Sequence, residues 1–143
     1  MKTVGFLFAI GASVTWGSVY VLDQRLLARI SPLTLLFVNS IFSLALTAPL
    51  ILLQKGDLGE LLSTIRPSLM LIATSLALGA LANYFIYSGI RLLGASNASV
   101  FEITYPFFVV LFSAMLLKET VSIVFVVGAI MIFIGVFVIL GWG

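Results

Sequence analysis

The stretch VSIVFVVGAIMIFIGVFVILGW, residues Val121–Trp142, carries no charged side chain from end to end. A helix of about 20 apolar residues crosses the hydrocarbon core of a bilayer, so this stretch predicts a transmembrane helix. Four earlier runs have a similar length and character, namely Val4–Leu22, Leu33–Leu53, Ser68–Ile90 and Asn97–Leu117. The sequence therefore predicts an all-α membrane protein, a bundle of five transmembrane helices.

The composition of the whole chain agrees with this class. Apolar residues make up 62% of the 143 positions and charged residues only 8%, whereas soluble domains carry roughly 25% charged residues. A formal net charge of +2 is too small to indicate a nucleic-acid partner. The absence of cysteine and histidine removes thiol chemistry and the commonest metal ligand and general base. We expect no enzyme activity, no cofactor and no metal.

Short connections between the runs predict antiparallel neighbours in a single domain that covers residues 1–143. The first run is as long as a full span and four more follow, so we do not expect it to be a cleaved signal peptide. The second connection, Gln54–Pro67, has the spacing of a short surface helix, and we favour a segment that only touches the bilayer surface over one with a recognition role. Its apolar residues at helical spacing are Leu58, Leu61, Leu62 and Ile65.

Lysine and arginine are distributed almost evenly between the two sides of the predicted bundle. Four of them would face one side, Lys2, Lys55, Arg66 and Lys118, and three would face the other, Arg25, Arg29 and Arg91. Orientation follows the bias of these residues in short loops. Two interpretations stay open: one orientation with the amino terminus in the cytoplasm, or dual topology, in which copies insert in both orientations and pair antiparallel.

Glu102 is the only charged residue inside one of the five runs. A charge at the bilayer centre costs at least about 2.5–3.5 kcal/mol and usually faces a bundle interior or a wet cavity. Pro106 removes the backbone hydrogen bond to the carbonyl of Glu102, which predicts a kink at the acid. Glu102 is therefore our candidate for proton or cation binding, and a position near the membrane interface is the competing interpretation.

Polar and aromatic side chains recur at helical spacing in the first and third runs. Trp16 and Tyr20 are four residues apart, as are Asn83 and Tyr87, and Tyr84 lies beside them. They either line a cavity or pack between helices with hydrogen-bonded polar groups. The polar residues of the second run favour hydrogen bonds between helices; they are Asn39, Ser40, Ser43 and Thr47.

Several short motifs follow one another in a characteristic order. They are Trp16-Gly17-Ser18, the stretch Asn83–Gly89, the small-residue stretch Gly94–Ser99, Tyr105-Pro106, the stretch Leu116–Ser122, and Gly128 through Gly135-Val136. In this order the chain resembles the EamA-type domain of the drug/metabolite transporter superfamily. Members of that family commonly have ten helices made of two inverted five-helix halves. The resemblance implies that this chain is one half of such an inverted-repeat transporter.

A single half implies a partner, either a second copy in a homodimer, which could be antiparallel, or a similar short chain in a heterodimer. The last run also resembles the dimerising helix of the small multidrug resistance proteins, which implies a dimer contact at Gly128, Ile132, Gly135 and Val136. Those proteins carry a membrane-embedded glutamate in their first helix, and this chain has none there. Their proton-coupled mechanism could only be placed on Glu102.

We therefore expect a multi-pass secondary transporter of the cell (inner) membrane that works by alternating access. Its partners would be membrane lipid and a small-molecule substrate, a metabolite or an amphipathic or cationic solute. The alternative is an accessory subunit that pairs with a similar short chain and does not transport alone. The residues expected to bind substrate or ion are Glu102, Trp16, Tyr20, Asn83, Tyr84, Tyr87 and Tyr105.

Overall fold

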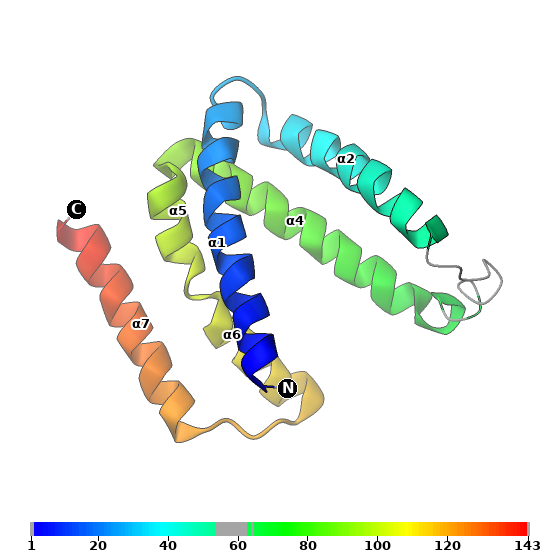
Figure 1. Cartoon of the computed structure of the whole chain (residues 1–143). Helices are drawn as coiled ribbons and strands as arrows, with labels where there is room; N and C mark the ends of the chain where they lie inside the picture. Colours follow the sequence, from blue (N-terminus) through cyan, green and yellow to red (C-terminus); the bar gives the residue numbers. More distant parts are fainter. Residues whose placement is uncertain (1, 54–62, 64, 143) are drawn as a thin grey trace.

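The computed structural model describes residues 2–53, 63 and 65–142, and every regular element in that part of the chain is a helix (Figure 1). The prediction of five transmembrane helices is confirmed. The helices that are long and apolar enough to cross a membrane are Val4–Leu27, Pro32–Ile51, Arg66–Leu93, Ala95–Leu117 and Ile123–Gly141. Leu58, Leu61 and Leu62 of the second connection lie outside the described residues.

The first two helices, α1 (Lys2–Leu27) and α2 (Pro32–Leu53), are joined by a short turn. Ser31 ends this turn, and its Oγ accepts a hydrogen bond from the amide of Thr34 at 3.1 Å. This bond satisfies one of the amides that a helix leaves unpaired at its start. Pro32 occupies the first position of α2, where its missing N–H costs no hydrogen bond.

A sharper turn joins the third span to the fourth. The third span consists of the single-turn 3₁₀ helix η1 (Arg66–Ser68) and α4 (Leu69–Leu93), and α5 (Ala95–Glu102) follows after one residue, Gly94. Gly94 has a φ of +83° and a ψ of 161°, a conformation that is essentially restricted to glycine. A glycine is therefore required for α5 to fold back against α4.

The remaining elements are α6 (Tyr105–Phe112), the π-helical turn η2 (Ser113–Leu117) and α7 (Ile123–Trp142). Lys118 follows η2 in the left-handed conformation, with a φ of 57°, and this ends the helix. An extended connection then leads to α7 (Figure 1). The two termini lie at opposite ends of the molecule, as an odd number of spans requires.

The core is small and lies at one end of the molecule, where α1, α2, α4 and α5 meet. Its buried residues are Tyr20, Leu27, Leu35, Tyr87, Ile90, Ala95 and Ala98. From this junction α2 and α4 run side by side away from α1, while α7 lies on the far side of α5 (Figure 1). Most large apolar side chains outside the junction are exposed on the isolated chain, which leaves them to lipid or to a partner.

Candidate functional site

The fourth span is broken directly after its acidic residue. α5 ends at Glu102 and α6 begins at Tyr105, with a short turn between them. In the turn, the amide of Thr104 donates to the carbonyl of Phe101, three residues back, at 3.3 Å. Pro106 has no N–H with which to continue the helical ladder toward Glu102. The break therefore places irregular polar backbone beside a carboxylate.

Glu102 is bonded across the bundle to Tyr20. The Tyr20 hydroxyl donates a hydrogen bond to Oε2 of Glu102, which connects α1 to α5. Tyr20 is buried, whereas the Glu102 side chain is exposed on the isolated chain. One turn earlier on α1, the ring of Trp16 packs edge-on against Tyr20, with ring centroids 6.1 Å apart. The carboxylate thus has a hydroxyl on one side and an open surface on the other.

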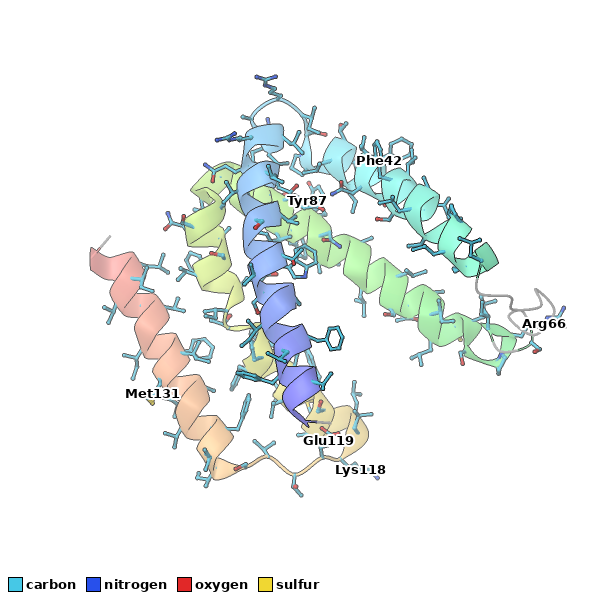
Figure 2. All side chains as sticks on the ribbon, in the orientation of Figure 1. Phe42, Arg66, Tyr87, Lys118, Glu119 and Met131 are labelled. Atoms are coloured by element: carbon cyan, nitrogen blue, oxygen red, sulfur yellow. The ribbon has the colours of Figure 1, made fainter. Side chains whose placement is uncertain are left out.

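A second polar contact joins α2 to α4 at the same junction. Nδ2 of Asn39 donates to the Tyr87 hydroxyl at 2.8 Å, and Tyr87 is only 4% exposed. Figure 2 shows Tyr87 near the end where the helices converge, far from Lys118 and Glu119 at the opposite end. The prediction that polar residues of the second span form hydrogen bonds between helices is thus confirmed for Asn39. Ser40 and Thr47 instead bond carbonyls of their own helix.

The expectation that Glu102 is the only charged residue within a span is wrong. Asp23 lies inside α1 and is 4% exposed, and it is the charged side chain that the described part of the chain buries most deeply. The apolar run ends at Leu22, but nothing before Pro32 stops a helix, so the backbone hydrogen bonds continue to Leu27. Hydropathy alone therefore misplaced Asp23 in a loop. Its three-residue spacing from Tyr20 was the available signal, because residues three apart share a helix face.

Gln24 was not predicted as a site residue either, yet it positions the helix that carries Glu102. Its side-chain Oε1 accepts a hydrogen bond from the amide of Ala95 at 2.7 Å. Ala95 is the first residue of α5, so α1 supplies a cap to a helix that begins 71 positions later. A Cβ added at Gly94 would lie 3.8 Å from Oε1 of Gln24, an ordinary van der Waals distance, so the turn requires glycine for its backbone conformation and not for space. The cap and the Tyr20 bond hold α5 against α1 at both ends.

The structure brings together some of the predicted site residues and separates others. Tyr20, Tyr87 and Glu102 lie at or beside the junction. The Asn83 amide donates instead to the carbonyl of Gly79 on its own helix, at 2.9 Å. Trp16, Tyr84 and Tyr105 leave 53%, 42% and 60% of their surfaces exposed. The predicted cavity wall is thus not closed within a single chain.

A cavity of about 480 Å³ lies between α7 and the break in the fourth span. Its lining is apolar and aromatic apart from Thr104 and Ser122. The other lining residues are Ile103, Pro106, Phe107, Val124, Phe125, Gly128, Ala129, Ile132 and Phe133. The rings of Phe107 and Phe133 meet edge-on, with centroids 5.5 Å apart, and join α6 to α7.

The residues expected to form a dimer contact lie along α7. Val136 is buried within the chain at 7% exposure, while Gly128 and Ile132 line the cavity just described. A Cβ added at Gly128 or Gly135 would meet nothing within 4 Å outside the helix's own backbone. The chain itself therefore does not fill the space beside either glycine, and the dimer contact stays a prediction.

In residues 2–53, 63 and 65–142, no three acidic, histidine or cysteine side chains are grouped so that they could hold a metal ion. Comparison with known proteins found no matching curated protein and no matching solved structure. The family model described as "EamA-like transporter family" matches residues 3–141. That match covers nearly the whole sequence, including the broken span with Glu102 and the junction that holds Tyr20. The chain therefore belongs to the EamA-like transporter family, and it is a multi-pass membrane transporter of the drug/metabolite transporter superfamily.

Proposed function

We propose that the chain is a secondary transporter of a small metabolite or of an amphipathic or cationic solute in the cell (inner) membrane. Two five-helix units form the working transporter, which alternates between two open states around a central site. The second unit is another copy of the chain or a similar short chain. Glu102 binds or exchanges a proton or cation in this site.

The bond between Tyr20 and Glu102 beside the broken span carries the proposal. In many secondary transporters, discontinuous helices form the substrate site near the bilayer midplane. α5 and α6 are such a discontinuous pair, with Glu102 at the end of the first segment. A charge in the hydrocarbon region is costly unless it faces a partner or a wet cavity. An exposed Glu102 on the isolated chain therefore favours a site that a second unit completes.

The small core supports the same assembly. Beyond the junction, α7 contributes two more buried apolar residues, Ala129 and Val136. Helices associate in membranes through close packing of small residues and through polar contacts rather than by the hydrophobic effect. Helices that diverge from one junction leave long faces free for a second unit (Figure 1). Nearly balanced flanking charges permit that unit to be an inverted copy.

The exposed aromatic side chains favour an amphipathic or cationic substrate. Trp16, Tyr84 and Tyr105 present ring surface on the isolated chain, and aromatic faces attract organic cations. The apolar cavity beside α7 would accept the hydrophobic part of such a solute. Glu102 would supply the opposite charge.

Purified protein in liposomes tests the proposal, with tetraphenylphosphonium as the probe and an imposed proton gradient as the driving force. We expect Glu102→Gln, which keeps the size and removes the charge, to lower uptake about tenfold or more, or about 1.4 kcal/mol in the barrier. Glu119→Gln is the matched control, because Glu119 lies in the exposed connection before α7. Parental rate and parental pH dependence in Glu102→Gln would contradict the coupling role.

Two further experiments distinguish whether the chain transports alone and whether it inserts in one orientation or two. Transport that appears only when a similar short chain is co-reconstituted would identify the accessory-subunit alternative. Carboxyl-terminal reporters, one active only in the cytoplasm and one active only outside, test the orientation. Signal from both reporters is expected for dual topology, and signal from one alone excludes it.

A further inference from the structure

Asp23 is buried near the point where four helices meet, and one of its two carboxylate oxygens is unpaired. It is 4% exposed, and its Oδ2 atom has no hydrogen-bond partner among the described residues. Buried carboxylates in proteins are normally paired or hydrogen-bonded, because an isolated charge loses its hydration and gains nothing in return. Packing does not explain Asp23, since an apolar side chain would fill the same space without that loss. A ligand that neutralises the charge would remove this cost.

The other polar groups of this junction are two hydroxyls, an amide and a second acid. Tyr20 lies three residues earlier on the same side of α1, and Tyr87 of α4 is buried in the same cluster as Tyr20. α5 contributes Glu102, through its bond to Tyr20, and α2 contributes the neutral amide of Asn39, through its bond to Tyr87. The arginines on these helices and their connection, Arg25, Arg29 and Arg91, are exposed. No described cation compensates the charge.

We infer that Asp23 is a proton-binding site. Its use in transport rests on the proposed function, whereas the binding of the proton does not. A proton fits this place better than a metal cation, because metal cations require several oxygen ligands. No third acidic side chain joins the two carboxyls in the described part of the chain. A proton needs only one carboxyl oxygen, and Oδ2 is free.

Infrared spectroscopy of the protein in liposomes tests the inference, because a protonated carboxyl has a carbonyl band that a carboxylate lacks. The sequence contains only two aspartates, Asp23 and Asp57, so uniform ¹³C-aspartate labelling moves the bands of these two alone. We expect a labelled protonated-acid band during a titration from about pH 5 to about pH 9, a range that buried carboxyls reach. The band should persist in Asp57→Asn and vanish in Asp23→Asn.

Two results overturn proton binding at Asp23: no protonated-aspartate band in the labelled parent protein over the whole range, or a band that Asp57→Asn removes. The labelled parent and Asp57→Asn decide the question even if Asp23→Asn does not fold. None of these measurements needs a substrate. A parent protein that shows the Asp23 band but transports nothing would therefore refute the proposed function and leave this inference standing.

Discussion

Replacing Gly94 by alanine should destabilise the fold through backbone strain alone. The residue forms the turn from α4 to α5 with a φ of +83° and a ψ of 161°. A side chain in this region costs about 1–3 kcal/mol. The added Cβ would lie 3.8 Å from the nearest Gln24 atom, an ordinary van der Waals distance, so no steric clash adds to this cost. We expect Gly94→Ala to lower the free energy of unfolding by about 1–3 kcal/mol.

Gly89→Ala is a closely matched control. An added Cβ at Gly89 would also lie 3.8 Å from its nearest neighbour, Ala98 Cβ, and Gly89 faces the same junction from within α4. The two substitutions therefore differ mainly in backbone conformation, because Gly89 is helical and Gly94 is not. Alanine favours a helix over glycine by about 1 kcal/mol, so Gly89→Ala should leave stability unchanged or raise it.

The assay is reversible unfolding in mixed detergent and dodecyl sulfate micelles, followed by the helical circular dichroism signal. It compares the free energies of unfolding of the parent and the two variants under one set of conditions. Equal unfolding midpoints for Gly94→Ala and Gly89→Ala would refute the reasoning, because the turn would then tolerate a side chain without strain.

Two further variants test individual contacts. Asn39→Ala removes the amide that bonds Tyr87. We expect it to lower the free energy of unfolding in the same assay by about 0.6 kcal/mol, the average for hydrogen bonds between membrane helices. Stability equal to the parent would show that the bond contributes nothing. Gly135→Leu should weaken dimerisation, because a close contact between two units would not tolerate a side chain at this position, whereas the single chain leaves space for one. An unchanged oligomer mass in detergent would count against the α7 contact.

The sequence predicts the number of spans because length and apolar character suffice to identify a membrane helix. It predicts helix ends less well, because hydropathy measures exposure to lipid and not backbone hydrogen bonding. The first apolar run stops at Leu22, yet α1 continues to Leu27. Because of this difference of about one turn, Asp23 and Gln24 were assigned to a loop. Asp23 is a buried acid, and Gln24 caps α5.

Sequence patterns indicate several polar residues of the junction but not their pairings. The cost of a charge in a span indicates Glu102, and four-residue spacing from Trp16 and Asn83 indicates Tyr20 and Tyr87. Which of them meet depends on which helices pack together, and no local pattern specifies that. Asn83 and Tyr87 share a helix face, yet the Asn83 amide bonds its own backbone while Tyr87 bonds α2. The carbonyl of Gly79, four residues back on α4, accepts the Asn83 amide in place of the expected contact.

The contact between Tyr20 and Glu102 spans 82 positions of sequence. A ribosome adds about 5–20 residues per second, so about 4–16 seconds pass between the synthesis of the two residues. During that interval α1 is already available for insertion, and neither Tyr20 nor Gln24 has its later partner on α5. The polar contacts that hold α5 against α1 can therefore form only after the fourth span has been synthesised.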